Sequence, residues 1–366
     1  MKIAFALAVH NPEDDRVWYQ QAQTLREHKH EIFVISATSK PINIDREGLF
    51  RIDKNIPHSQ KINNFCHFLS IVNPDVIICD NPVSVLAAHK YRKKSKNRQL
   101  KIYYDITEYY PSKIHFHHTS KICNILKFPI LCGISLYTSL LVSGFIFGEY
   151  YKALPYKIFF WKRNVNLSYY ADLNQIKIYP INKNNRKIVL FFAGKLNEAS
   201  GFNAVSQVVE QCARRFPDTY FVLRVVSADV NSAHTQINGK NLETELFPKL
   251  PFEVFCKKFG EADIFFDLRK INWENSRCLP IKLFYYMAAG RPVVYSNLKA
   301  IRKGVPEIDE FGFLVNPENI SSIVDIVSEY LLNKQLYINH CQRARQLCEE
   351  KYNWQNIKNQ FVELFL

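Results

Sequence analysis

Short apolar runs alternate with amphipathic segments along the whole chain of 366 residues. Strands buried on both faces are typically continuous apolar runs, whereas helices repeat their apolar positions every third or fourth residue. The alternation therefore predicts parallel β/α architecture. In the first half we expect strands at Lys2–Ala8, Glu31–Ser36, Val76–Cys79, Lys101–Ile106, Leu140–Phe147 and Tyr156–Phe160. Helices are expected at Arg16–His28, Ile62–Val72 and Pro82–Lys94, from about residue 121 to Thr138, and near residues 149–153.

A polar stretch, Asn174–Arg186, separates this series from a second one. Its expected strands are Lys187–Ala193, Tyr220–Val226, Ile264–Leu268, Pro292–Tyr295 and Gly312–Val315. Its expected helices are Gly201–Phe216, Pro251–Phe259, Ile281–Gly290, Ser321–Asn333, Gln335–Glu350 and Trp354–Leu366. We therefore expect a Rossmann-like domain over 1–170, a linker over 171–186 and a second Rossmann-like domain over 187–350. The remaining residues, 351–366, form a C-terminal helix that can cross back to the first domain.

Composition narrows the class of protein. Hydrophobic residues make up 47% and charged residues 22%, a globular balance. Neither G-x-G-x-x-G nor G-x-x-x-x-G-K-[ST] occurs, which excludes the two common glycine-built phosphate sites. The nine cysteines contain no C-x-x-C pair, as expected for buried free thiols in the cytoplasm. The first ten residues lack a cleavage site and are interpreted as a buried strand rather than a signal peptide.

The charge is unevenly distributed. The net charge is +14, and residues 1–180 hold 24 Lys and Arg against 14 Asp and Glu. Such a chain is expected to bind a nucleoside diphosphate, an anionic membrane or another polyanion. The densest cationic run, Lys90–Lys101, is either a solvated helix end or a phospholipid contact. No nucleic-acid-reading motif accompanies it, so we expect no nucleic-acid partner.

One segment is long enough to cross a bilayer. Phe128–Gly148 contains 21 residues without a charge. It also contains Pro129, Gly133 and several hydroxyl residues, which favours an apolar helix ending near Thr138 followed by a short strand. Such a helix can lie on a membrane surface without crossing it. Three histidines precede it, but their spacing suits a loop and no Cys or carboxylate cluster accompanies them, so no metal site is expected at His115, His117 and His118.

The most informative segment for chemistry is Pro280–Val294. A helix there ends at Gly290, which can adopt the left-handed conformation of a helix terminus. Lys282 lies near the start of this helix, where backbone N–H groups and the helix dipole favour a phosphate. The alternative is an ordinary amphipathic helix with a lysine on its solvent side.

Several segments together resemble one family. Those of the second half, Ala193–Gly201, Ala262–Ile264, Leu279–Val294 and Gly312–Pro317, look like the C-terminal domain of the group 1 (family 4) glycosyltransferases. His10–Val17 and Tyr104–Pro111 resemble the N-terminal domain of the same family. The resemblance implies an α/β protein of the GT-B fold, in which two doubly wound Rossmann-like domains face each other across a cleft. It also implies metal-independent, retaining transfer of a sugar from a nucleotide-sugar donor.

The resemblance implies donor-binding residues in the second domain. In the loop after its first strand, Lys195 stands where members commonly have Arg, and Ser200 stands where they have Lys. The paired glutamates of the family correspond to Arg277 and Tyr285, so both carboxylates are replaced. The candidate donor-binding residues are Gly194, Lys195, Glu198, Gly201, Asn275, Arg277, Lys282 and Tyr285.

In the first domain, Asp105 and Glu108 follow a central strand and are the candidate catalytic residues. Thr107 lies between them, where members often have a histidine. His10, Asp15 and Arg16 follow the first strand and are expected to face the acceptor. Alternatively, Asp14 or Asp15 caps the helix that begins at Arg16.

The leading hypothesis is a glycosyltransferase of cell-surface polysaccharide synthesis, with a glycan or lipid-linked glycan as acceptor. It would need no cofactor and no metal, and would be cytoplasmic and peripheral at the inner face of the plasma membrane. The lost glutamates leave a second hypothesis open, a non-catalytic GT-B-like subunit that tethers or regulates a partner glycosyltransferase. A sugar epimerase on the same fold is a weaker alternative.

Overall fold

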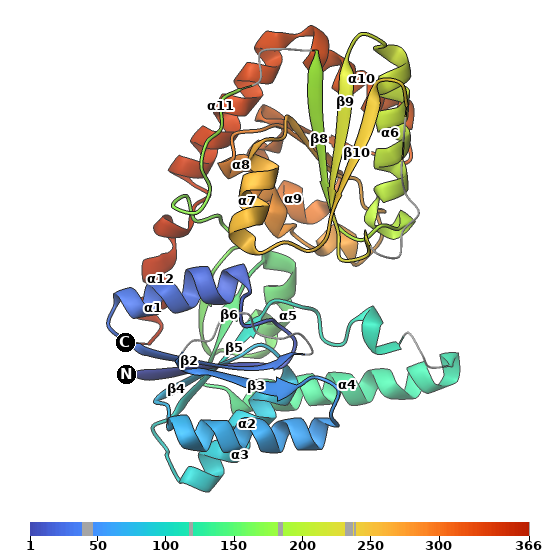
Figure 1. Cartoon of the computed structure of the whole chain (residues 1–366). Coiled ribbons are helices and arrows are strands. Elements are labelled where there is room, and N and C mark those ends of the chain that lie inside the picture. The colour runs from blue at the N-terminus through green and yellow to red at the C-terminus, as the bar shows by residue number, and fades with distance from the viewer. Residues whose placement is uncertain (39–46, 117–119, 182–185, 231–236, 238, 366) are drawn as a thin grey trace. The chain divides into compact units, whose positions relative to one another are not determined.

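The computed structural model describes residues 1–38, 47–116, 120–181, 186–230, 237 and 239–365 (Figure 1). The chain forms two compact units. The first comprises Met1–Ser168 and Ile357–Leu366, and the second comprises Tyr169–Asn356. Each unit is built on one parallel sheet, as the alternation of apolar runs and amphipathic segments predicts.

The sheet of the first unit has seven strands in the order β3-β2-β1-β4-β5-β6-β7. Their bounds are Lys2–Leu7 (β1), Glu31–Thr38 (β2), Leu49–Asp53 (β3), Val76–Cys79 (β4), Lys101–Ile106 (β5), Gly144–Phe147 (β6) and Arg163–Asn166 (β7). The helices are Gln23–Glu27 (α1, preceded by a π-helix, Asp15–Ala22), His58–Val72 (α2), Pro82–Ser95 (α3), Lys121–Leu141 (α4), Tyr150–Phe159 (α5) and Lys358–Glu363 (α12), with a 3-10 turn at Lys113–Phe116.

The sheet of the second unit has six strands in the order β10-β9-β8-β11-β12-β13. Their bounds are Lys187–Ala193 (β8), Tyr220–Val226 (β9), Leu242–Phe247 (β10), Ile264–Asp267 (β11), Val293–Ser296 (β12) and Gly312–Val315 (β13). The helices are Phe202–Arg215 (α6), Phe252–Gly260 (α7), Ile281–Ala288 (α8), Lys299–Gly304 (α9), Ile320–Leu332 (α10) and Lys334–Glu350 (α11). Short 3-10 turns occupy Glu198–Ser200, Asn275–Arg277, Pro306–Glu310 and Trp354–Asn356.

The strand order decides where ligands can bind. In each sheet the order reverses at the first strand of the unit, between β1 and β4 and between β8 and β11. Open parallel sheets bind ligands beyond the carboxyl ends of their strands at such a reversal. The loops after β1 and β8, which contain His10 and Gly194, therefore occupy the expected positions for two sites.

Some expected elements are wrong. Tyr156–Phe160 is the end of helix α5 and not a strand, and the edge strand is the largely polar β7 instead. A short apolar run fits a strand and a buried helix face equally well, and here Tyr156 packs inward while Phe159 is exposed. The strands β3 and β10 were not expected, because these edge strands carry few fully buried residues.

The segment expected as a linker is part of the second unit. Ala171 bridges to Asn353, Ile176 is buried, and the carbonyls of Tyr179 and Pro180 accept hydrogen bonds from Arg291. The last residues, in contrast, pack within the first unit, because the hydroxyl of Tyr103 donates to the carbonyl of Leu364 at 2.8 Å. The expected boundary at 351 is therefore displaced to residue 357.

The uncharged segment Phe128–Gly148 forms a helix followed by a strand, as expected, although α4 extends three residues beyond Thr138. Strand β6 is buried inside the sheet, so this segment as a whole is not one spanning helix. By length and composition alone, the part Ile122–Leu141 could still cross a membrane. Only 17% of its most apolar stretch is buried within the structure. Seven of its exposed apolar residues share one face, and we call them the α4 stripe: Ile122, Ile125, Leu126, Ile130, Leu136, Tyr137 and Leu140. Phe128 is exposed as well but is not part of the stripe.

Candidate functional site

The second unit places two cations at the carboxyl edge of its sheet. Lys282 lies in the first turn of α8, and its Nζ donates to the carbonyl of Ala193, the last residue of β8. Arg269 follows β11 and donates from Nε to Oδ1 of Asp267 at 2.7 Å and from Nη2 to Oδ2. Two cations share one carboxylate there, so the edge carries an excess positive charge that suits an anion. Lys282 was expected from the sequence, whereas Arg269 was missed, although its position directly after a buried strand was a usable signal.

The titration of Lys282 reflects this environment. Burial disfavours its charged form, Asp267 opposes that effect, and the nearby charge of Arg269 adds to it, so that the pKa of Lys282 falls to about 8. Lys282 therefore loses its charge at a much lower pH than an exposed lysine does. An anionic ligand would compensate the cost of burying the charge and raise this pKa again.

The glycine loop after β8 packs directly against the end of β11. Gly201 has φ +84°, and a Cβ at this position would overlap the carbonyl oxygen of Leu268. Only glycine therefore allows the start of α6 to approach the strand so closely. The exposed residues Lys195 and Glu198 lie on this loop, and Oε1 of Glu198 is 3.7 Å from Nζ of Lys270. The loop of Gly194 and Gly201 is thus brought beside residues 268–270, with Lys195 in solvent.

Arg277 and Tyr285, two of the expected donor-binding residues, lie in different environments. Arg277 donates to the carbonyl of Trp273 at 3.1 Å, and its guanidinium lies 4.6 Å from the centre of the Trp273 ring. Tyr285 is buried, and its ring packs against Phe252 and Phe259 of α7. Within the described part of the chain, the buried hydroxyl of Tyr285 has no hydrogen-bond partner. An unpaired buried hydroxyl is costly, but at 3% exposure the side chain of Tyr285 is closed to a ligand in this structure.

Asn275 has a local role in the same loop. Its side-chain amide donates to the carbonyl of Lys270 at 2.8 Å, and its backbone N–H donates to Oδ1 of Asn272 at 2.9 Å. These bonds close the loop that follows β11, which places Asn275 near the candidate anion site but directs its amide into the loop itself.

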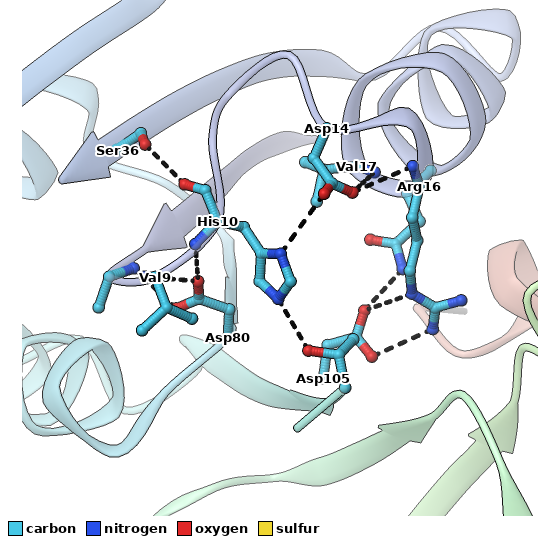
Figure 2. A network of polar contacts seen from close by, with 11 residues as sticks. Val9, His10, Asp14, Arg16, Val17, Ser36, Asp80 and Asp105 are labelled. Atoms are coloured by element: carbon cyan, nitrogen blue, oxygen red, sulfur yellow. Dashed lines mark hydrogen bonds and ion pairs between the residues drawn. The ribbon is translucent and has the colours of Figure 1, made fainter. Parts of the chain in front are cut away.

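In the first unit, His10 is the centre of a polar network at the carboxyl end of β1 (Figure 2). Its Nδ1 is 3.4 Å from Oδ2 of Asp14, and its Nε2 is 2.9 Å from Oγ1 of Thr107. Asp80, after β4, accepts backbone hydrogen bonds from residues 8, 9 and 10 at 2.7–3.0 Å. The turn after β1 is therefore held by Asp80, and His10 is presented to two further groups.

Asp105 is engaged on both carboxylate oxygens. Arg16 forms a bidentate pair with it, with N–O distances of 3.2 and 3.1 Å, and Gln21 donates to Oδ2 at 2.7 Å. Arg16 also donates to the carbonyl of Leu167 at 2.7 Å. Around these groups remains a cavity of about 10 Å³, which holds one water molecule at most. The geometry favours a positioning role for Asp105 and Arg16, because a sugar has no access to either.

The carboxylates near the start of the π-helix differ in role. Asp14 is the N-cap and accepts from the backbone N–H groups of Arg16 and Val17. Burial and the charge of Asp14 raise the pKa of Asp15 to about 7.

Glu108 is exposed beyond β5 and forms no hydrogen bond or ion pair with any described residue. Of the two candidate catalytic carboxylates, Glu108 is therefore the accessible one.

We expect the free energy of unfolding to depend on the charge of His10. Burial lowers its pKa, but the hydrogen bond to Asp14 and the charges of Asp14, Asp80 and Asp105 outweigh this and raise the pKa to about 9. Because the folded pKa exceeds the unfolded value of about 6.5, the stabilisation is complete below pH 6.5 and is lost as pH rises through 9. His10→Gln should therefore cost about 1–3 kcal/mol at pH 6 and much less at pH 9.5.

Urea unfolding of both proteins at the two pH values measures this effect. An equal loss of stability at pH 6 and pH 9.5 would show that His10 contributes through packing and not through its charge.

No metal cluster occurs among the residues that the structure describes. In these ranges, no group of three His, Cys, Asp or Glu side chains is close enough to hold a metal ion. Of the three histidines considered above, His117 and His118 lie outside the described residues, and Nδ1 of His115 bonds within its own turn to Ser112.

Comparison with known proteins identifies the architecture. No protein-family model matches the chain. An uncharacterized glycosyltransferase of Haemophilus influenzae is 26% identical over 159 residues, which is 43% of either chain, so the match spans less than half of that relative. Sucrose-phosphate synthase of Thermosynechococcus elongatus has a TM-score of 0.72 at 12% identity, covering 100% of this chain and 98% of its own.

A second structure, HepE of Anabaena in complex with UDP-glucose, has a TM-score of 0.69 at 15% identity and covers 100% of this chain and 99% of its own. At these identities the likeness concerns the fold. Together with the two parallel α/β sheets, it confirms the expected architecture: the chain has the GT-B fold.

Proposed function

We propose that this chain is a glycosyltransferase that moves a sugar from a nucleoside-diphosphate sugar to a glycan or lipid-linked glycan of the cell surface. The observation that carries the proposal is the pair of cations, Lys282 and Arg269, at the reversal point of the second sheet. A diphosphate at this edge would meet both cations and the N-terminus of α8. The glycosyltransferase name of the relative and the UDP-glucose bound to HepE are consistent with such a ligand.

The proposed reaction is metal-independent and retaining. The bond between the sugar and the diphosphate breaks, the acceptor hydroxyl loses its proton to the solvent as its oxygen bonds to the sugar, and the nucleoside diphosphate leaves with one more negative charge. Lys282 and the N–H groups of α8 would stabilise that charge, the role that a divalent ion has elsewhere. Lys195 and Arg277 are further candidate donor contacts. On the acceptor side, Glu108 is the accessible carboxylate.

A donor screen tests the proposal. At millimolar concentration, one of UDP-glucose, UDP-N-acetylglucosamine, GDP-mannose or TDP-glucose should raise the melting temperature by several degrees. A ligand at 100 times its Kd stabilises by about 2.7 kcal/mol. The shift should be the same with and without EDTA, because no metal takes part. Absence of any shift would contradict donor binding, and a shift that depends on added Mg²⁺ or Mn²⁺ would contradict the metal-free site.

The replaced glutamates support a second candidate, a non-catalytic subunit that tethers or regulates a partner glycosyltransferase. Arg277 and Tyr285 supply no carboxylate at either position. The two candidates differ in turnover: the enzyme transfers a sugar or slowly hydrolyses the donor by itself. The subunit does neither and co-purifies with an active partner.

We also propose that the chain is cytoplasmic and binds the inner face of the plasma membrane through the α4 stripe. Purified protein should sediment with anionic vesicles of phosphatidylcholine and phosphatidylglycerol, and less so at high salt. Ile130→Glu should reduce binding at least several-fold, because it places a charge within the stripe. Ile71→Glu is the matched control, since Ile71 is similarly exposed but belongs to α2. Equal binding of both variants would contradict contact through α4.

A further inference from the structure

Helix α4 has the reverse of the usual amphipathic pattern. Each residue of the α4 stripe is 50–74% exposed, and the stripe follows one face of the helix at helical intervals of three, four and seven residues. The hydroxyl residues Thr138 and Ser139 face inward and are fully buried. Their hydroxyls donate to carbonyls of the preceding turn at 2.7–3.1 Å, so they need no further partner. A helix with its apolar side outward is adapted to apolar surroundings.

A pocket of about 190 Å³ opens beside this helix, between α4, α5 and the loop after β5. Its lining is mainly aromatic and aliphatic, with the side chains of Tyr109, Tyr110, Leu136, Pro155, Tyr156 and Phe159. Leu136 and Phe159 are also 53% and 73% exposed, so the mouth of the pocket is continuous with the α4 stripe. An apolar chain could therefore pass from the surface into the pocket without crossing water.

The lining of the pocket also includes two charged side chains. These are Glu108, in the loop after β5, and Lys152 of α5. Lys152 is 3% exposed on its side chain, lies 2.6 Å from Oε1 of Glu149, and donates to the carbonyl of Thr107. The pocket thus connects an apolar surface with the candidate acceptor carboxylate Glu108. A lining of apolar side chains together with two charged ones suits a molecule that has a hydrocarbon chain at one end and a polar, sugar-bearing head at the other.

The surrounding charge identifies the source of such a molecule. Residues 81–171 contain 14 Lys and Arg but only three carboxylates, Asp105, Glu108 and Glu149. Asp105 and Glu149 are paired with cations, as described above. At the C-terminal end of α4, Lys162 and Arg92 donate to the last carbonyls of the helix. An apolar stripe with cations at one end, in a part of the chain that is rich in Lys and Arg, complements an anionic lipid bilayer, where the apolar chains lie below phosphate groups.

We propose that the pocket between α4 and α5 binds the hydrocarbon chain of a lipid-phosphate-linked acceptor drawn from the membrane. This inference rests on the proposed function and names the acceptor class for it. The chain lies between Leu136, Tyr156 and Phe159, and the head group reaches Glu108. The phosphate, which joins the chain to the head group, lies between the two, on the side of Lys152 and Glu108.

Protection of Cys132 tests the proposal on the unmodified protein. Cys132 lines the pocket, whereas Cys123 is exposed on the opposite side of the same helix. Dodecyl phosphate, used below its micelle concentration, should slow alkylation of Cys132 by N-ethylmaleimide at least fivefold, as followed by peptide mass spectrometry. The rate at Cys123 should not change. Unchanged labelling of Cys132, equal slowing at both cysteines, or equal protection by inorganic phosphate would each overturn the proposal.

A pair of variants on α4 provides the matched comparison. Ser135 lines the pocket, and Ser135→Phe should block it and abolish protection of Cys132. Gly133 is exposed, and a Cβ at this position would have open space around it, so Gly133→Phe should keep full protection. Protection that persists in a folded Ser135→Phe protein would also overturn the proposal. Binding of the four nucleotide sugars of the donor screen, measured on the same samples, separates the two proposals. Donor binding without protection of Cys132 contradicts only the lipid pocket. Protection of Cys132 without binding of any of the four donors contradicts only the proposed transfer.

Discussion

Replacing Lys282 with methionine is expected to weaken binding of the nucleotide-sugar donor about a hundredfold, or ~3 kcal/mol. Methionine keeps most of the volume of the side chain but removes the charge that faces Asp267 and Arg269. A charge-assisted hydrogen bond to a diphosphate is stronger than a neutral one, and the low polarity of the site increases its contribution. Isothermal titration calorimetry with the donor found in the screen measures the loss.

Two controls show whether the charge is responsible. Lys257→Met removes an exposed lysine from the C-terminal part of α7 and should leave the affinity unchanged. The affinity of the unmodified protein should be constant below pH 7 and fall as pH rises above about 8, by up to tenfold per pH unit, because only protonated Lys282 pairs with the diphosphate. The Lys282→Met protein should lack this dependence. A flat profile in the unmodified protein would place the diphosphate elsewhere.

The second large effect concerns stability. Arg16→Met is expected to lower the free energy of unfolding by about 3–5 kcal/mol, because it leaves the Asp105 carboxylate buried without its ion-pair partner. The side chains are 4% and 6% exposed, so water does not replace the lost contact. Asp105→Leu alone should be similarly destabilising. The double variant should lose much less than the sum, since the two charges are removed together. Urea unfolding measures all three.

Comparing Asp105→Leu with Glu108→Gln separates the roles of the two candidate catalytic carboxylates. Glu108→Gln alters an exposed group and should change stability by less than about 0.5 kcal/mol while lowering the rate of transfer. Asp105→Leu should lower stability, with the loss of activity following the loss of folded protein. If the losses of unfolding free energy in Arg16→Met and Asp105→Leu simply add up in the double variant, the two side chains do not stabilise the fold through each other, contrary to the bidentate geometry.

Most of the fold could be predicted because its signal is local. Continuous apolar runs such as Lys2–Leu7 and Lys187–Ala193 are strands buried on both faces, and they need no knowledge of their neighbours. The errors occur where the local pattern is ambiguous or weak. Tyr156–Phe160 is apolar on both sides because α5 has one buried and one exposed apolar face, and the edge strands β3 and β10 have little to bury.

The candidate sites could be predicted only in part. The place of Lys282 at the start of a helix could be predicted because a helix N-terminus has a local sequence signature, whereas Gly201 was named from the family resemblance. Arg269 was not predicted from the sequence. It lies near Lys282 only because the ends of two strands meet at one edge of the sheet, where both cations are close to Asp267. Likewise, no local pattern shows that Asp105 forms an ion pair with Arg16, which is 89 residues away along the chain.

The sequence by itself determined that this protein has two parallel β/α units, a cationic first half and an uncharged apolar segment before β6. These properties depend on the order and spacing of residue types. Only the tertiary structure decided which side of α4 faces outward, that Asp105 is closed off while Glu108 is accessible, and that a pocket connects Glu108 with the α4 stripe. The physical reason is that burial and ion pairing arise from contacts between distant segments, and these contacts form only when the sheets are assembled.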